Sequence, residues 1–351
     1  MKSTLRQSSF FTKIFHWEFW PFTLFYSPIF LYWLWLSIKA RSFFFFTASN
    51  PAIETGGMMG ESKIKILDQI PSEYLPQTFF VTIGTTKNAI QAKMKSMDIS
   101  FPVIAKPDIG ERGRMVEKIV NEQELEAYLN IIKVDFIIQE YISFPLELGV
   151  FYVRYPEEEQ GKITSLVIKD FLKVTGDGKS TVLELMKNYP RASFQLGRIG
   201  PRLGERASYV PAQGETVDLE PIGNHARGTT FLNGNHFIDV QLHEVFNVIS
   251  NKIPGFYYGR YDLRCSSMED LKQGKNIRIM EINGAGAEPA HIYHPDSSIF
   301  LAYKALFSHW KMLYIVSTQN HKKGIPYMSF REARKKYREV MRYQKILLGN
   351  G

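Results

Sequence analysis

The stretch that decides the fold is YYGRYDLRCSSMEDLKQGKNIRIMEINGAGAEP, residues 257–289. It predicts two strands, at 257–264 and 276–283, joined by a polar turn for which SSMEDLKQGK supplies the residues. Side chains two positions apart on a strand point to the same face. If the two strands pair as neighbours, we therefore expect their polar side chains to gather at one place.

These polar side chains predict a metal site. Arg260 and Asp262 share one face of the first strand, and Glu281 and Asn283 share one face of the second. Two carboxylates and an amide oxygen suit Mg²⁺, a hard ion that completes its octahedron with water and substrate phosphates. The alternative interpretation is an ordinary hairpin with solvated polar residues.

Length and composition indicate a globular protein of at least two lobes. The chain has 351 residues, of which 44% are hydrophobic and 22% charged. Its net charge of +8 is concentrated in residues 322–351, where nine Lys or Arg and two Glu give +7 and leave +1 for the rest. This distribution excludes a nucleic-acid footprint over the whole surface. The single cysteine, Cys265, excludes an internal disulfide framework and fits a reducing compartment.

The N-terminal part is strongly aromatic. Residues 10–46 hold 17 of the 49 Phe, Tyr and Trp residues, and no charge occurs from 19 to 38, about the minimum for a membrane-spanning helix. Pro28 would kink such a helix near its middle. Three arrangements follow: the segment spans a membrane, dips in and returns at Pro28, or packs as an aromatic surface on the soluble domain. We expect membrane contact through residues 10–46.

A basic helix is predicted at the C-terminal end, over SFREARKKYREVMRYQKILL, residues 329–348. Tyr337, Val340, Met341 and Gln344 would lie on one side, with Lys and Arg elsewhere. Such a helix could rest on anionic lipid. The alternative is a solvated helix face.

A glycine-rich loop lies within FPVIAKPDIGERGRMVEKI, residues 101–119. A strand at 103–106 ends in Lys106, the loop DIGERGR follows, and a second strand is expected at 115–120. The loop's backbone N–H groups, with Arg112 and Arg114, could close over phosphates, and Lys106 would add a fixed charge. The alternative is a flexible surface hairpin. Upstream, a glycine-rich lead-in precedes a short helix at 63–70.

An extended linker between two lobes is predicted at residues 140–145. Asn121 would cap a helix at 121–132, a strand is expected at 136–139, and another at 147–155. In the linker at 140–145, free backbone groups suit an adenine edge. Glu140 and Glu147 could take its amine and the ribose hydroxyls.

The remaining segments predict three helices and one polar loop. The helices are expected at 181–188 with Ser180 as N-cap, at 236–253 and at 297–316. The loop at 221–235 is rich in Gly and Asn and carries His225 and Arg227, and long loops of this kind are usually functional or disordered. The phosphate-loop pattern fails because Lys173 stands where its first glycine is required, and GAGAEP at 284–289 breaks the dinucleotide glycine pattern at Pro289. His291 with His294 lacks the further ligands of a zinc site.

Five of these pieces, in this order, resemble the ATP-grasp superfamily, and within it the D-alanine–D-alanine ligase and cyanophycin synthetase-like branch. The pieces are ESK at 61–63, FPVIAKPDIGERGR, QEYISFPLE, GRYDLR and MEINGAGAEP. The resemblance implies an α+β fold in which two α+β lobes clasp ATP. It covers residues 60–316, with the lobes at about 60–142 and 143–316, and leaves the aromatic segment 1–50 and the basic helix at 322–351 outside. VTGDGKSTVLELM is most similar to the cyanophycin synthetase-like branch.

The resemblance also implies roles for individual residues. Those implied in nucleotide binding are Lys63 and Lys106 at the phosphates, Gly110, Arg112 and Gly113 in the loop above them, Glu140 and the backbone of Ile142 at the adenine, Glu147 at the ribose, and Lys169 as a further phosphate contact. Those implied in holding two Mg²⁺ ions, or Mn²⁺ in their place, are Asp262, Glu281 and Asn283. Arg260 resembles the arginine that steadies the transferred phosphoryl group, and we expect His225 and Arg227 to approach the acceptor.

The activity implied is a carboxylate–amine ligase. A substrate carboxylate would attack the γ-phosphate of ATP, and an amine would attack the resulting acyl phosphate to form an amide. The family's α/β domain that helps hold the acceptor is replaced here by the aromatic segment before Lys63, a departure from true D-alanine–D-alanine ligases. Alternatives are nucleotide binding without turnover and phosphorylation of another acceptor. Because ATP is cytoplasmic, we expect the domain at the cytoplasmic face of a membrane.

Overall fold

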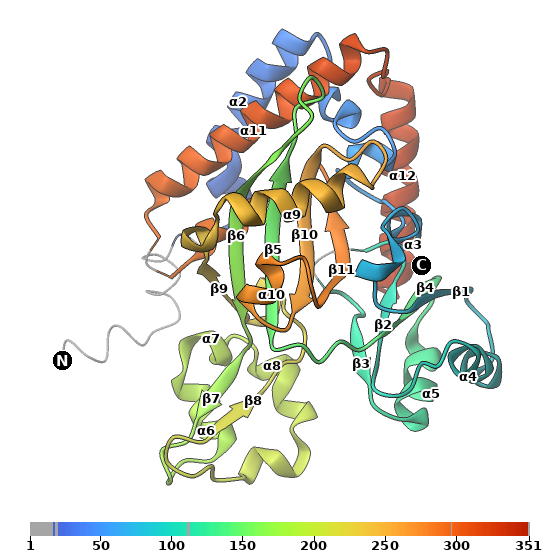
Figure 1. The fold of residues 1–351 in the computed structure, drawn as a ribbon. Helices are drawn as coiled ribbons and strands as arrows, with labels where there is room; N and C mark the ends of the chain where they lie inside the picture. Colours follow the sequence, from blue (N-terminus) through green and yellow to red (C-terminus); the bar gives the residue numbers. More distant parts are fainter. Residues whose placement is uncertain (1–16, 18–19, 111–112, 296, 350–351) are drawn as a thin grey trace.

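The computed structural model describes residues 17, 20–110, 113–295 and 297–349, and arranges them in two lobes with a smaller unit below (Figure 1). The described strands form three sheets in which all neighbours are antiparallel. Helices and antiparallel sheets together confirm the predicted α+β class.

The first lobe is a four-stranded sheet in the order β1–β4–β2–β3. Its elements are β1 (Thr78–Val81), α4 (Lys87–Ser96), β2 (Val103–Pro107), β3 (Glu117–Ile119), α5 (Glu122–Ile131) and β4 (Phe136–Glu140). Val103 and Ala105 pack into a core with both helices, so alternation turns Lys106 to the opposite face. Asn121 caps α5 as predicted, because its side chain accepts a hydrogen bond from the Glu124 amide at 2.9 Å.

The second lobe is a five-stranded sheet in the order β11–β10–β5–β6–β9. Its strands are β5 (Leu146–Val153), β6 (Lys162–Asp170), β9 (Thr230–Asn233), β10 (Tyr258–Cys265) and β11 (Ile277–Asn283). The strands β5 and β10 are buried along almost their whole length, but one face of β10 carries Arg260, Asp262 and Arg264. On one face lie α9 (Val240–Asn251) and α10 (Met268–Lys272), as Figure 1 shows.

The opposite face of this sheet is covered by two helices from the two ends of the chain. They are α2 (Phe22–Ala40) and α11 (Ile299–Lys322), which pack against each other (Figure 1). Tyr303 of α11 stacks on Phe25 with ring centroids 5.4 Å apart, and Phe307 meets Tyr32 edge-on at 5.0 Å. The sheet therefore lies between two helical layers.

The described residues of the aromatic segment bear on the arrangements predicted for it. None of the helices that the structure describes has the length and apolar character needed to cross a membrane. The α2 helix also runs without interruption through Pro28, so the chain does not turn back there. Its described residues pack on the globular domain because α11 offers a complementary apolar face. Residues 10–16, 18 and 19 lie outside the described part.

A small unit with its own hydrophobic core follows β6 in the chain. Its elements are β7 (Lys173–Thr175), α6 (Val182–Asn188), α7 (Pro190–Ser193), α8 (Leu196–Ile199) and β8 (Thr216–Asp218). The predicted N-cap Ser180 was wrong by one residue. Thr181 caps α6 in a reciprocal pair with Glu184, whereas the Ser180 hydroxyl donates to Asp177 at 2.7 Å.

The basic C-terminal helix forms as predicted, as α12 (Phe330–Leu347), and it is docked rather than fully solvated. Val340 is buried, and Leu347 packs into the core of the first lobe. The Tyr343 hydroxyl donates to the carbonyl oxygen of Asp135 at 3.3 Å. Tyr337, expected on the same side as Val340, is 55% exposed. This helix therefore ties the C-terminal end to the first lobe.

Other element ends differ from the predicted ones because capping residues fix them. Asp239 accepts a hydrogen bond from the Leu242 amide at 2.9 Å, so α9 begins at Val240. Ser267 caps α10 inside the segment predicted as a simple turn. The remaining short helices are α3 (Lys63–Leu67), η3 (Phe45–Ala48), η4 (Glu54–Gly56), η5 (Ser72–Tyr74), η6 (Gly200–Arg202), η7 (Gly204–Ser208), η8 (His225–Arg227), η9 (Asn235–Phe237) and η10 (Ala290–Tyr293).

Candidate active site

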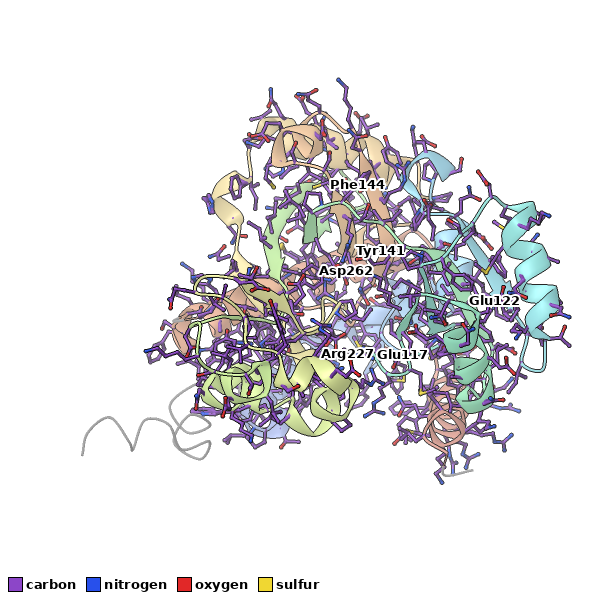
Figure 2. All side chains as sticks on the ribbon, turned by 90° about the horizontal axis from the view of Figure 1, so that it is seen from below. Glu117, Glu122, Tyr141, Phe144, Arg227 and Asp262 are labelled. Atoms are coloured by element: carbon purple, nitrogen blue, oxygen red, sulfur yellow. The ribbon has the colours of Figure 1, made fainter. Side chains whose placement is uncertain are left out.

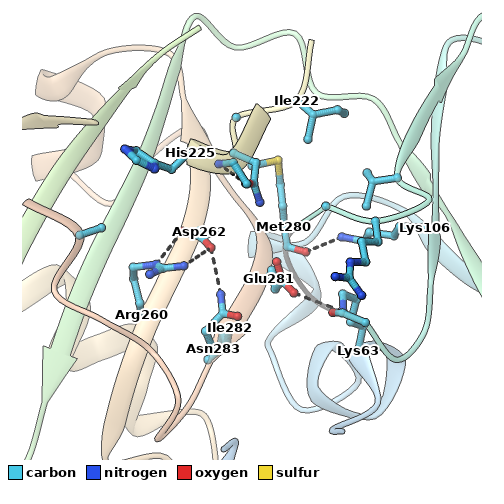
Figure 3. A pocket seen from close by; sticks show the side chains of 18 of the residues that line it. Lys63, Lys106, Ile222, His225, Arg260, Asp262, Met280, Glu281, Ile282 and Asn283 are labelled. Carbon is cyan, nitrogen blue, oxygen red and sulfur yellow. Dashed lines mark hydrogen bonds and ion pairs between the residues drawn. The ribbon is translucent and has the colours of Figure 1, made fainter. Parts of the chain in front are cut away.

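The two strands of the opening motif pair as predicted, and their register brings the predicted ligands together. Asp262 of β10 lies opposite Glu281 of β11, and Arg260 lies opposite Asn283 (Figure 3). A bulge follows, because Leu263 pairs with Ile279 and leaves Met280 as the extra residue. The bulge turns the Met280 carbonyl toward the first lobe.

Asp262 is buried and surrounded by donors. Arg260 reaches both of its carboxylate oxygens, with Nε 3.0 Å from Oδ1 and Nη2 3.1 Å from Oδ2. The Lys169 ammonium lies 3.4 Å from Oδ1, and the Asn283 amide donates to Oδ2 at 2.9 Å. Burial alone would raise the pKa of Asp262, but the two cations outweigh it and lower that pKa to about 2. The carboxylate is therefore ionised.

The first lobe contributes two lysines to the same place. Lys106 Nζ is buried and donates to Gln139 Oε1 and to the Met280 carbonyl, each at 3.0 Å (Figure 3). Lys63 Nζ donates to the Gly110 carbonyl at 2.7 Å and lies 3.5 Å from Glu281 Oε1. Burial lowers the pKa of Lys106 to about 8, against the attraction of Glu281. The two lobes thus meet through lysines of one and the β10–β11 pair of the other.

Lys63 is held near the end of β11 by an unusually tight approach of two backbone segments. Gly57 has a φ of +81°, and a Cβ there would lie 2.6 Å from the Gly284 Cα. Backbone hydrogen bonds join the segments, with the amides of Ala285 and Gly286 each 2.9 Å from the carbonyls of Gly56 and Gly57. Only glycine allows this contact, which holds the lead-in to α3 directly beside the end of β11.

The predicted ribose ligand Glu147 is engaged in a buried ion network. Its Oε1 lies 3.1 Å from Lys169 Nζ, and its Oε2 accepts from Arg264 Nε at 3.0 Å. Arg264 Nη1 also donates to the Ile142 carbonyl at 2.7 Å, and Glu140 accepts from the Gln77 amide at 3.1 Å. Arg264 was not among the predicted site residues, although it continues the alternation of Arg260 and Asp262 along β10.

One cavity of about 560 Å³ collects these groups. The predicted residues that line it are Lys63, Lys106, Gly110, Gly113, Glu140, Ile142, Glu147, Lys169, His225, Arg260, Asp262, Glu281 and Asn283. Arg112 lies outside the described residues. The structure therefore brings nearly all the predicted site residues, from six separate stretches of sequence, around one space.

Arg227 is the predicted residue that the structure does not bring into the lining. It is buried, with Nη1 3.3 Å from Glu220 Oε1, and it donates to the Val116 carbonyl at 2.9 Å and to the Gly113 carbonyl. Figure 2 shows it beside Glu117, below Asp262. Arg227 therefore fastens the loop after β8 to the glycine-rich loop of the first lobe.

Several lining residues had no signal in the sequence. The N-terminal segment supplies Trp17, Trp20, Phe22, Phe25 and Tyr26, and α12 supplies Val340, Tyr343 and Gln344. Glu288, five residues after Asn283, also lines the cavity, and burial raises its pKa to about 7. These residues come from opposite ends of the chain, so only the tertiary fold reveals them.

The donor set around Asp262 fits a magnesium ion. The described residues contain no cluster of three or more His, Cys, Asp and Glu side chains that could hold a metal. An ion at this place would therefore depend on two carboxylates and an amide. Two carboxylates on facing strands, with an amide, leave most of an octahedron to water and phosphate oxygens, which is what Mg²⁺ prefers. Three lysines around them would complement a triphosphate.

Several solved structures of ligases are similar to this chain. No family model and no curated protein matches the chain. Among solved structures, D-alanine–D-alanine ligase from Bacillus anthracis is 12% identical with a TM-score of 0.42, over 77% of this chain and 70% of that one. VanG D-Ala:D-Ser ligase from Enterococcus faecalis is 13% identical with a TM-score of 0.42, over 76% and 64%.

A third similar structure is a bifunctional glutathione synthetase from Pasteurella multocida, 13% identical with a TM-score of 0.37 over 70% of this chain. The chain spans 36% of the length of that protein. All three TM-scores lie below 0.5.

Proposed function

We propose that the protein is an ATP-dependent carboxylate–amine ligase of the ATP-grasp type, which forms an amide through an acyl phosphate. The observation that carries this proposal is the convergence of Lys63 and Lys106 from one lobe on the Asp262–Glu281 pair of the other. A cavity between lobes, with lysines on one wall and carboxylates on the other, suits a metal-bound triphosphate.

Each group has a task in phosphoryl transfer. Lys63, Lys106 and Lys169 would bind phosphate oxygens, and Mg²⁺, held by Asp262, Glu281 and Asn283, would neutralise charge that develops during transfer. The substrate carboxylate oxygen attacks the γ-phosphorus, the bond to the β–γ bridging oxygen breaks, and ADP leaves with that electron pair. An amine then displaces phosphate from the acyl carbon.

Arg260 lies beside the carboxylate that would hold the metal. Its guanidinium donates to both oxygens of Asp262. A metal held by Asp262 would share this carboxylate with Arg260 and would neutralise charge on the phosphate oxygens. Arg260 itself would bind and stabilise the transferred phosphoryl group.

The test is nucleotide binding and turnover by a double variant. Asp262→Asn with Glu281→Gln removes both carboxylates while keeping side-chain volume. Calorimetry should show loss of Mg²⁺-dependent ATP binding, and ADP release with pooled carboxylic acids and amines should disappear. The control is Asp98→Asn with Glu159→Gln, two exposed positions. Unchanged ADP release in the site variant would reject the proposal, and binding without any turnover would leave a nucleotide-binding protein instead.

For the location of the protein, we propose that the outward face of α2 rests on anionic lipid at the cytoplasmic face of a membrane. Leu24, Leu31 and Ile38 recur every seven residues on that face and are 57%, 71% and 68% exposed. Lys39 and Arg41 follow at its end, where headgroup phosphates would lie.

Flotation with vesicles tests this location. Wild-type protein should float with vesicles that contain phosphatidylglycerol, and a variant with Leu24, Leu31 and Ile38 changed to Ser should remain at the bottom. Changing the exposed Val248 to Ser, on the far side of the second sheet, is the control. Equal flotation of wild type and the triple variant would refute the proposal.

A further inference from the structure

The N-terminal segment lines part of the cavity with aromatic side chains. Trp17 stacks on Phe25 with centroids 4.8 Å apart and lies 5.7 Å from the Tyr293 ring. Its indole N–H donates to the Ser297 carbonyl at 2.7 Å. Phe22 stacks on Tyr26 at 4.4 Å. We call Trp17, Trp20, Phe22, Phe25 and Tyr26 the aromatic wall.

The Glu288 carboxylate lies at the polar end of this wall. Glu288 accepts hydrogen bonds from the Tyr26 hydroxyl and, at 2.7 Å, from the Tyr293 hydroxyl. Its backbone carbonyl accepts from Arg260 Nη1 at 3.2 Å, so the residue lies directly beside the phosphoryl-transfer groups. The Glu288 carboxylate is held by two phenols, and the Arg260 guanidinium is bound to the Glu288 backbone carbonyl.

The chemistry of this subsite selects a cation. A buried carboxylate is costly unless a positive charge or several donors accompany it, and two phenols are modest compensation. Aromatic faces attract ammonium groups and bind apolar bodies. A second carboxylate at this place would be repelled by Glu288. An ammonium group with an apolar substituent satisfies both the acid and the wall.

We propose that the aromatic wall and Glu288 form the binding subsite for the amine substrate, which is a primary amine with an apolar or aromatic body. This inference rests on the ligase activity proposed above. It also assigns the N-terminal segment a task in catalysis, since α2 supplies the wall where the acceptor must lie.

Amide formation at this subsite uses Glu288 as the proton acceptor. The ammonium group transfers one proton to a Glu288 carboxylate oxygen, and the nitrogen lone pair attacks the carbonyl carbon of the acyl phosphate. A C–N bond forms, the C–O bond to the phosphoryl group breaks, and phosphate leaves with that electron pair. The second nitrogen proton goes to the phosphate, and a neutral amide remains. The raised pKa of Glu288, about 7, suits a group that takes up and releases this proton near neutral pH.

Calorimetry with matched probes tests the subsite. Phenethylamine, 2-phenylethanol and phenylacetate share a body and differ in charge. They are titrated into the full chain in the presence of Mg²⁺ and a non-hydrolysable ATP analogue. We expect phenethylamine to bind at least tenfold more tightly than the alcohol, and phenylacetate most weakly. Glu288→Gln should abolish the preference for the amine, whereas Glu159→Gln, an exposed position, should keep it.

A second variant tests the wall itself. Phe22 is 51% exposed at the rim of the cavity, so Phe22→Ala leaves the core intact. It should weaken phenethylamine severalfold and butylamine less. Equal affinity of the wild type for the amine and the alcohol would overturn the inference, as would an amine preference that survives Glu288→Gln. If the ATP analogue itself fails to bind, the ligase proposal fails; if it binds and the amine preference is absent, only the subsite fails.

Discussion

Lys106 of the first lobe donates a hydrogen bond of 3.0 Å to the carbonyl oxygen of Met280, across the cavity between the lobes. The carbonyl is available because Met280 is the extra residue of the bulge in β11. The bond connects a phosphate-binding candidate to the strand that carries Glu281. It also shows that the side chain points at the proposed metal site.

Replacing Lys106 by methionine should weaken ATP binding at least tenfold, about 1.4 kcal/mol, because a charge-assisted contact to phosphate is lost. Equilibrium binding of a fluorescent ATP analogue measures the change. Lys95→Met, at an exposed position of α4, is the matched control and should bind like the wild type. Equal affinity of both variants would remove Lys106 from the site.

The buried network of Arg264, Glu147 and Lys169 predicts that removing a buried cation destabilises the fold far more than removing an exposed one. Arg264→Leu leaves Glu147 buried with one partner fewer, and we expect a loss of about 3 kcal/mol in the free energy of unfolding. Lys173→Met breaks an exposed pair with Asp170 and should cost less than about 1 kcal/mol. Urea denaturation measures both. If Arg264→Leu lowered the free energy of unfolding as little as Lys173→Met does, the network would add no stability.

Alternation along the strands made the centre of the site predictable. Period-two patterns placed Asp262, Glu281 and Asn283 together, and the end of a buried strand indicated Lys106. These inferences need only local geometry and the pairing of two neighbouring strands. The phosphate-binding roles of Lys63 and Lys169 came from the family resemblance alone.

Contacts between distant segments were not predictable in the same way. Nothing local indicates that Tyr26 reaches Glu288, 262 residues further along the chain. The charge pattern likewise could not show that both oxygens of Glu147 are already bound by cations, because Lys169 and Arg264 come from other strands. An apolar, aromatic helix also suits lipid and protein equally well, so the docking of α2 on α11 required the tertiary structure.

Two glycines with similar backbone angles should differ sharply in their tolerance of alanine. Gly57 and Gly84 have φ values of +81° and +87°, but only Gly57 has a neighbour, the Gly284 Cα, within reach of an added Cβ. Gly84→Ala should cost about 1 kcal/mol from backbone strain alone. Gly57→Ala should cost more and also weaken ATP binding, since it separates the lead-in to Lys63 from β11. Thermal unfolding and ATP titration measure the two effects, and equal behaviour would show that the close approach is unimportant.

Glu288 predicts how stability depends on pH. Burial raises its pKa from 4.5 to about 7. Between these values the unfolded chain releases the proton while the folded protein keeps it, so the free energy of unfolding contributed by Glu288 falls as pH rises, by about 3 kcal/mol in all. Glu288→Gln removes this loss. Urea titrations at pH 5, 6, 7 and 8 should therefore show the variant gaining on the wild type up to about pH 7 and then running parallel to it. A constant offset across all four pH values would contradict the prediction, and Glu159→Gln should show such a constant offset.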